Sequence, residues 1–148
     1  MKFNFERGEI KINVPLKSQI VYSGIKIPIA SKKGEKWSKL ILGDYTNKRG
    51  VYIHHSNNKI LYVGNTTQGP YGTFGERLRR EFQYTASVNS RLHQLLASQK
   101  NPVFSYFLDL DDIDSMINTG SSTLKKERKA LILEQVLIGV YSPEGNRT

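Results

Sequence analysis

The stretch "RGVYIHHSNNKILYVG" occupies residues 49–64 and contains two apolar segments separated by Ser56-Asn57-Asn58. Asparagine tolerates the left-handed backbone conformation that a tight turn between two strands requires. We therefore predict a β-hairpin with strands at 50–55 and 59–64. This hairpin is the centre from which the rest of the fold is predicted.

Each strand of the predicted hairpin carries one tyrosine, Tyr52 and Tyr62. Residues opposite each other in an antiparallel pair share a face of the sheet, so a three-residue loop at 56–58 would place the two tyrosines together. A two-residue turn would instead set Tyr62 opposite Ile53, on the other face. We expect the three-residue loop if the tyrosines act together. The high strand propensity of tyrosine is the simpler explanation, and it predicts nothing about the loop.

The sequence before the hairpin is predicted to form short or edge strands, because apolar and polar residues alternate there and prolines interrupt them. The two alternating segments and the basic loop that follows them are "EIKINVPL" (9–16), "IVYSGIKIPIA" (20–30) and "SKKGEKWSK" (31–39). We assign residues 1–49 to a β-rich N-terminal extension packed on a core of residues 50–148, within a single compact domain.

After the hairpin, the sequence predicts helices and one more strand. Thr73 and Glu76 have the spacing of a capping box, which indicates a helix that starts near Phe74. The other predicted elements are a helix with the apolar stripe Val88, Leu92, Leu95 and Leu96, a buried strand at 103–110, an acidic loop "DDID" at 111–114, and a long helix at 123–141 capped by Ser or Thr.

Composition restricts the chemistry. The 148 residues include no cysteine, which excludes structural disulfides, thiolate-bound metals and cysteine nucleophiles. No apolar run has the length of a membrane span, and the amino terminus lacks the apolar stretch of a signal peptide. We expect a soluble, cytoplasmic protein with no membrane partner.

The chain is strongly basic, with 22 Lys and Arg against 13 Asp and Glu and a formal net charge of +9. Such a charge favours a polyanionic partner, and nucleic acid is the leading candidate. The charge is spread along the chain, so a soluble basic domain without such a partner is the competing interpretation.

Glu134 is unusual within the long predicted helix. Its neighbours three and four residues away, Ala130, Leu131, Leu137 and Ile138, are all apolar. A buried carboxylate needs a cation, hydrogen-bond donors or water, and a metal ion would serve. The alternative is that Glu134 lies at the edge of a wide apolar stripe and is hydrated.

Four sequence blocks, in order, resemble the GIY-YIG nucleases. "GVY" (50–52) and "YVG" (62–64) correspond to the two signature triplets, and "ERLRREF" (76–82) resembles the helix that carries the family's arginine. "EQVLIGVYSPEGN" (134–146) resembles the block with the metal-binding glutamate and the terminal asparagine. One triplet is a weak signal, whereas four ordered blocks are a strong one.

The resemblance implies an α/β fold in which a small central sheet, the hairpin plus the 103–110 strand, is flanked by helices. It implies hydrolysis of phosphodiester bonds in double-stranded DNA with one Mg²⁺ or Mn²⁺ ion per active site. Glu134 would hold the ion, and Arg77 would clamp the scissile phosphate with its planar guanidinium group. The oligomeric state, monomer or homodimer, stays open.

The resemblance also implies roles for the two tyrosines and an asparagine. Tyr52 would deprotonate or orient the attacking water, and Tyr62 would hydrogen-bond the phosphate or that water. A tyrosine pKa near 10 makes this residue a poor base at neutral pH unless a cation lowers the value. Asn146 would position the surroundings of Glu134 or the phosphate.

One position departs from the family pattern. Several members carry histidine or tyrosine four residues after the arginine, and this chain has Glu81 there. Glu81 could accept a proton, and pairing with Arg77 at i+4 is the favoured alternative. His54 lies on the same strand face as Tyr52 and is a substitute candidate for proton transfer, although a histidine on a strand surface often has no such role.

The expected DNA contacts are basic and aromatic residues in loops and on the helix after the hairpin. They are Lys32, Lys33, Lys36 and Lys39 in the basic loop, Tyr71 in the loop "NTTQGPYGTFG" (65–75), and Arg79 and Arg80. The glycines and the aromatic residues Tyr71 and Phe74 of that loop suit close approach to a DNA groove, or they pack locally.

Three functions are weighed. We favour a compact endonuclease of restriction or mobile-element type, because all five family positions are filled and the chain ends two residues after Asn146, without a long DNA-reading arm. The alternative is a non-catalytic nucleic-acid-binding protein on the same scaffold. An RNA-binding module without cleavage rests only on the basic charge.

Overall fold

A four-stranded antiparallel sheet forms the centre of the molecule in the order β3-β6-β4-β5. The computed structural model describes residues 2–5, 8–69, 72–84, 90–120 and 123–147. The strands of this sheet are β3 (Ile25–Ile27), β4 (Gly50–Ser56), β5 (Lys59–Thr66) and β6 (Val103–Asp109). The α/β class, the hairpin and the strand after it are therefore confirmed.

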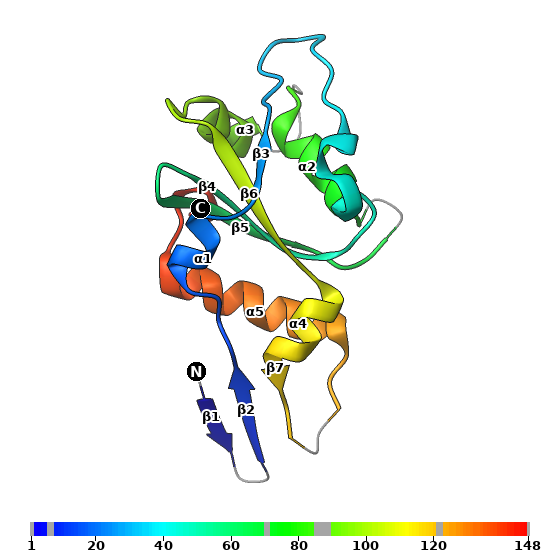
Figure 1. The fold of residues 1–148 in the computed structure, drawn as a ribbon, viewed down its shortest axis with the longest axis vertical. Helices are drawn as coiled ribbons and strands as arrows, with labels where there is room; N and C mark the ends of the chain where they lie inside the picture. The colour runs from blue at the N-terminus through cyan, green and yellow to red at the C-terminus, as the bar shows by residue number, and fades with distance from the viewer. Residues whose placement is uncertain (1, 6–7, 70–71, 85–89, 121–122, 148) are drawn as a thin grey trace.

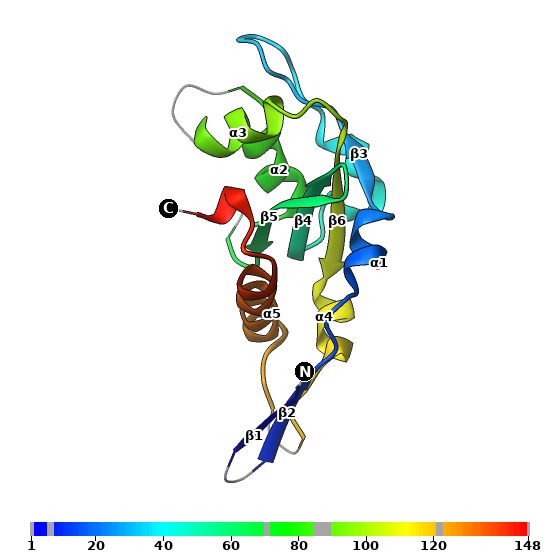
Figure 2. The ribbon, with the colours of Figure 1, turned by 90° about the vertical axis from the view of Figure 1, so that its left-hand side faces the viewer.

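Helices cover both faces of the sheet (Figures 1 and 2). One face is covered by α2 (Phe74–Phe82), α3 (Ser90–Ala97) and the 3₁₀ segment η1 (Lys39–Tyr45), whose buried residues include Leu78, Leu96 and Leu42. The other face is covered by α1 (Lys17–Val21), α4 (Leu110–Met116) and α5 (Lys126–Tyr141), whose buried residues include Ile20, Ile113 and Leu133. We call these the α2 face and the α5 face.

A second, smaller sheet extends away from this body (Figure 1). It consists of β1 (Lys2–Phe5), β2 (Gly8–Ile12) and β7 (Ile117–Asn118), with β2 paired to both neighbours. The segment before residue 50 thus contributes to both sheets, because β3 pairs with β6 in the central one. No helix within the described ranges is long and apolar enough to cross a membrane.

The hairpin turn differs from the expected one. Asn57 and Asn58 form a two-residue turn with φ values of 50° and 64°, and Ser56 pairs with Lys59. The prediction of a three-residue loop was wrong. Two consecutive residues with positive φ give the turn that matches the right-handed twist of the strands, and asparagine accepts this conformation.

The two tyrosines nevertheless share a face, because a β-bulge follows the turn. His55 pairs with Ile60 and His54 pairs with Tyr62, so Leu61 is an extra residue on β5. One extra residue reverses which face the later side chains occupy. Tyr52 lies opposite Gly64, and Tyr62 is on the same α2 face as Tyr52.

Local sequence signals set several element boundaries. The Thr73 side chain accepts a hydrogen bond from the backbone N–H of Glu76, which confirms the predicted start of α2. The acidic segment 111–114 is helical rather than a loop, because Asp109 caps α4 and supplies the acceptor at its first turn. The N-cap of α5 is Lys125, without a side-chain cap, so the expected Ser or Thr cap was wrong.

Candidate active site

A buried polar cluster connects the central sheet to α2. The Tyr52 hydroxyl donates to Glu81 Oε2 at 2.5 Å, and His54 Nε2 lies 2.7 Å from Glu81 Oε1. On the other side of the ring, His54 Nδ1 lies 2.7 Å from the Ser105 hydroxyl of β6. These four residues are each at most 1% exposed. We call them the buried tetrad.

Within the buried tetrad, Glu81 has other partners than the sequence predicted. Its two carboxylate oxygens are occupied by Tyr52 and His54, so the favoured pairing with Arg77 was wrong. The physical reason is orientation: Glu81 lies with Leu78 and Phe82 on the buried side of α2, while Arg77 is partly exposed. A buried carboxylate is tolerated here because both oxygens have partners.

Tyr62 lies between the tetrad and the protein surface. Its ring stacks on His54 with centroids 5.8 Å apart, and it is 6.1 Å from the Tyr52 ring. Burial and then the Glu81 charge raise the pKa of Tyr62 to about 12, with a further contribution from Glu134. Burial and then the Glu81 charge likewise raise the pKa of Tyr52 well above its ordinary value. Both hydroxyls are therefore protonated at neutral pH.

Arg77 places a positive charge beside the tyrosines. It occupies the first turn of α2 and is partly exposed. Its charge acts to lower the pKa of both Tyr52 and Tyr62, against the larger effects of burial and of Glu81. A guanidinium group at this position can bind an anion that approaches Tyr62 from solvent.

Glu134 approaches the same tyrosine from α5, at the edge of the sheet. It is partly exposed, and its charge contributes to the raised pKa of Tyr62. β5 is an edge strand, so a helix that packs on the α5 face can bring a carboxylate near a side chain of the opposite face. The amide of Gln135 donates to Glu134 Oε1 at 3.4 Å, and no ion pair to Glu134 occurs among the described residues.

Asn146 is held by the backbone of β5 rather than directed toward Glu134. Its side-chain amide donates to the Val63 carbonyl at 2.8 Å, and its side-chain oxygen accepts from the Val63 N–H at 2.9 Å. The asparagine thereby acts as a strand partner for the open edge of the sheet. It fixes η2 (Glu144–Asn146) against β5.

Gly50 and Gly64, the glycines of "GVY" and "YVG", are required by close packing. A Cβ atom at Gly64 would lie 2.4 Å from the hydroxyl oxygen of Tyr52 and 2.8 Å from Cε2 of Tyr62. A Cβ atom at Gly50 would lie 2.0 Å from the Leu108 carbonyl oxygen of the neighbouring strand. Gly64 therefore leaves the space that the two tyrosine rings occupy.

The predicted DNA contacts divide into two groups. Lys32, Lys33 and Lys36 are exposed, on a loop whose Trp37 is buried and donates from Nε1 to the Pro28 carbonyl at 2.8 Å. Glu76 binds both Lys39 and Arg79, at 3.0 and 3.1 Å, and these hydrogen bonds lower the pKa of Glu76.

The remaining predicted contacts lie on α2 and in the loop before it. Arg80 is exposed on α2. Phe74 is fully buried in the core on the α2 face, so of its two expected roles the local packing is the one confirmed. Tyr71 lies outside the described residues.

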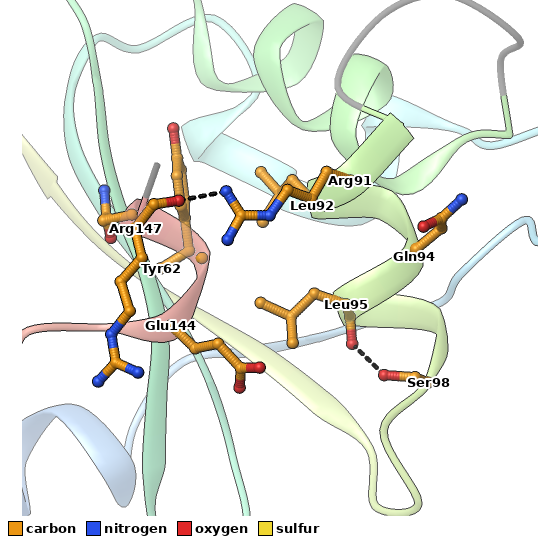
Figure 3. Close-up of a pocket in the computed structure, with 10 residues that line it drawn as sticks. Tyr62, Arg91, Leu92, Gln94, Leu95, Ser98, Glu144 and Arg147 are labelled. Carbon is orange, nitrogen blue, oxygen red and sulfur yellow. Dashed lines mark hydrogen bonds between the residues drawn. The ribbon is translucent and has the colours of Figure 1, made fainter.

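A cleft of about 680 Å³ adjoins the tyrosine side of the site (Figure 3). Tyr62, α3 and η2 form its walls, and Arg91 of α3 donates to the backbone carbonyl of Arg147. Sequence reasoning missed Arg91, which carries no motif signal. Sequence reasoning also missed Ser105. It could have been found by assigning the residues of β6 to the two faces of the sheet, because Ser105 pairs with His54 of β4.

The donors available for a metal ion are few. In the described part of the chain, no three His, Asp or Glu side chains are grouped so that they could hold a metal ion by themselves.

Comparison with models of known protein families, with curated proteins and with solved structures finds no match to this chain.

Proposed function

We propose that this chain is a metal-dependent endonuclease of double-stranded DNA with an active site of the GIY-YIG type. The observation that supports this proposal most is that two charged residues from different helices both influence the pKa of Tyr62. Arg77 from α2 and Glu134 from α5 both act on the ionisation of this one partly exposed hydroxyl, although they come from opposite faces of the sheet. An arginine, a carboxylate and two tyrosine hydroxyls are four of the five groups that the resemblance assigns to the site. The fifth, Asn146, is bound to the Val63 backbone.

The residues fit a Mg²⁺ or Mn²⁺ ion that depends on substrate for most of its ligands. Mg²⁺ is commonly bound through one or two carboxylates, with waters and substrate phosphates completing its shell. Glu134 supplies one partly exposed carboxylate, without an ion-pair partner among the described residues. When bound, the ion would supply Lewis-acid activation of the phosphate.

Arg77 binds the scissile phosphate in this proposal. A planar guanidinium can donate two parallel hydrogen bonds to one phosphate, and these strengthen as negative charge develops on its oxygens. Tyr62 donates its phenolic proton to the same phosphate or to the attacking water. Its raised pKa keeps that proton in place at neutral pH.

Tyr52 transfers a proton rather than acting as a free phenolate. The phenol proton already points at Glu81 Oε2, 2.5 Å away. Because Tyr52 is at most 1% exposed, the attacking water reaches its oxygen only when the neighbouring Tyr62 ring moves aside. As that water gives a proton to the Tyr52 oxygen, the tyrosine passes its own proton to Glu81. The tyrosine ends neutral, so its raised pKa is no obstacle.

His54 and Ser105 hold Glu81 in the orientation needed for this transfer. His54 contacts the other oxygen of Glu81, and Ser105 fixes the opposite nitrogen of the ring. In this proposal Glu81 takes the place of the histidine or tyrosine that several family members carry at this position. His54 then acts through Glu81 and not on the water itself.

The second candidate is a non-catalytic nucleic-acid-binding protein on the same scaffold. One observation favours it: the buried tetrad is complete and closed to solvent, with every member at most 1% exposed. A tetrad of this kind also serves to fix α2 on the sheet. The net charge of +9 suits either function.

Incubation of the purified protein with supercoiled plasmid separates the two functions. We expect nicked or linear product with Mg²⁺ or Mn²⁺ and none with EDTA. The second candidate instead predicts that plasmid is retarded in a gel without any cleavage under either condition.

A further inference from the structure

The cleft between α3 and η2 shares a wall with the candidate active site. Tyr62 belongs to both, with its ring stacked on His54 on the tetrad side and its side chain also lining the cleft. A molecule bound at Arg77 and Tyr62 can therefore continue into the cleft. Figure 3 shows Leu95 from α3 and Glu144 from η2 directed into the space between the two elements.

The size of the cleft selects its occupant. Its volume of about 680 Å³ lies in the range of about 300–1,000 Å³ that is typical for sites of single small molecules. One nucleotide fits such a space, and a DNA duplex does not. A single unstacked nucleotide is therefore of a suitable size for the cleft, whereas a turn of double helix is too large.

The lining suits the two chemical parts of a nucleotide. Leu92 and Leu95 provide apolar surface for a base, next to the aromatic ring of Tyr62. Arg91 uses a guanidinium N–H to bind the Arg147 carbonyl, and its other N–H groups are suited to a phosphate. Arg91 is exposed, so a phosphate can reach it without loss of that contact.

Glu144 is the one carboxylate among the described residues that line the cleft, and it limits how many phosphates can enter. Glu144 lies 3.4 Å from Lys59, which offsets part of its negative charge. A second phosphate beside Glu144 would be repelled, whereas an uncharged base or sugar would not. The polar contacts therefore point to one phosphate at Arg91 and a base against Leu95.

We propose that this cleft binds one nucleotide of the strand being cut, adjacent to the scissile phosphate, with its phosphate on Arg91 and its base against Tyr62 and Leu95. The proposal rests on the proposed function. It adds that the protein recognises an unstacked nucleotide in DNA. Such a nucleotide occurs at a flipped, mismatched or single-stranded position.

Binding of deoxyadenosine 5′-monophosphate, measured by titration calorimetry, tests the cleft directly. We expect Arg91→Ala and the cleft-filling change Ser98→Trp each to weaken binding about tenfold or more, because one removes the phosphate contact and the other occupies the space. Arg128→Ala removes an exposed arginine of α5 that does not line the cleft. It is the matched control and should bind within about twofold of wild type.

Ser98 is exposed directly after α3, so the tryptophan is compatible with folding. Binding that is equal in Arg91→Ala, Ser98→Trp and wild type, or no binding to wild type, would overturn the proposal. A separate measurement isolates the proposed function: Glu134→Gln should bind the nucleotide as wild type does and lose plasmid cleavage. Full cleavage by Glu134→Gln with normal nucleotide binding would reject the nuclease assignment and leave the cleft site standing.

Discussion

Single residues around Tyr62 decide what chemistry the site can perform. Its pKa of about 12 and the raised pKa of Tyr52 disfavour a phenolate base at neutral pH when no cation is bound beside them. A proton passed from water through Tyr52 to Glu81 avoids this difficulty, because neither tyrosine becomes an anion. In the proposed mechanism the tetrad thus lets Tyr52, a poor base by itself, pass a proton on to Glu81.

The raised tyrosine pKa values predict a loss of stability in alkali. Folding keeps both phenols neutral, so their contribution is fully present below the unfolded pKa near 10 and is lost as pH rises through the folded pKa, about 12 for Tyr62. Urea unfolding at pH 9 and pH 11 should show a smaller loss of stability in Tyr62→Phe than in wild type. Tyr22→Phe, at a position 79% exposed, is the control and should behave like wild type.

Arg77→Lys should lose most cleavage activity although it keeps the charge. Lysine is a point charge without the two parallel N–H groups that fit a phosphate, so we expect a fall in kcat of about a hundredfold or more. Arg79→Lys should lose much less, because Arg79 binds Glu76 at 3.1 Å. A larger loss in Arg79→Lys would contradict the assignment of Arg77.

The sequence predicted which residues form the site better than it predicted their contacts. Tyr52 and His54 were expected on one face because strand residues alternate, and they lie on one face. Tyr62 was expected there only with a three-residue loop, and it reaches that face through the bulge instead. The contacts of Glu81 were missed because its side chain can either pair with the partly exposed Arg77 at i+4 or face the buried sheet, and the rotation of α2 decides between the two. That rotation is set by Phe74, Leu78 and Phe82 packing on the sheet, which is a tertiary effect.

At the scale of elements, the hairpin departs from the predicted register twice, at the turn and at the bulge, and the two changes cancel. The two-residue Asn57-Asn58 turn alone would have separated the tyrosines, and the extra residue Leu61 brought them back to one face. A single bulge has no clear sequence signal, because it depends on the packing of both strands. The strands were predictable from their apolar pattern, whereas their register was not.

Gly64→Ala tests this packing. The added Cβ would meet the Tyr52 hydroxyl at 2.4 Å, so both rings must move. We expect a stability loss of about 1–3 kcal/mol, as for overpacked cores, together with at least a tenfold loss of cleavage. Gly139→Ala on α5, where a Cβ meets no atom within 4 Å, should retain both stability and activity. Unchanged activity in Gly64→Ala would show that the positions of the tyrosines do not matter.

At the scale of the whole molecule, the proposed function predicts that positive charge attracts DNA. The net charge of +9 and the exposed lysines of the basic loop favour contacts with many phosphates. A protein that neutralises about 6 phosphates loses on the order of a thousandfold in affinity between 50 and 200 mM salt. Fluorescence anisotropy with labelled duplex DNA should show this slope, and a flat response would argue against DNA as the partner.

The measurement that tests the central claim most directly compares the two glutamates of α5 in a single-turnover plasmid cleavage assay. Glu134→Gln should lose at least about a thousandfold in rate and keep its affinity for DNA, because the amide no longer offers a metal its carboxylate while the basic contacts remain. Glu127→Gln, at the other end of the same helix, should cleave within about twofold of wild type. Cleavage by Glu134→Gln at the wild-type rate would contradict the account.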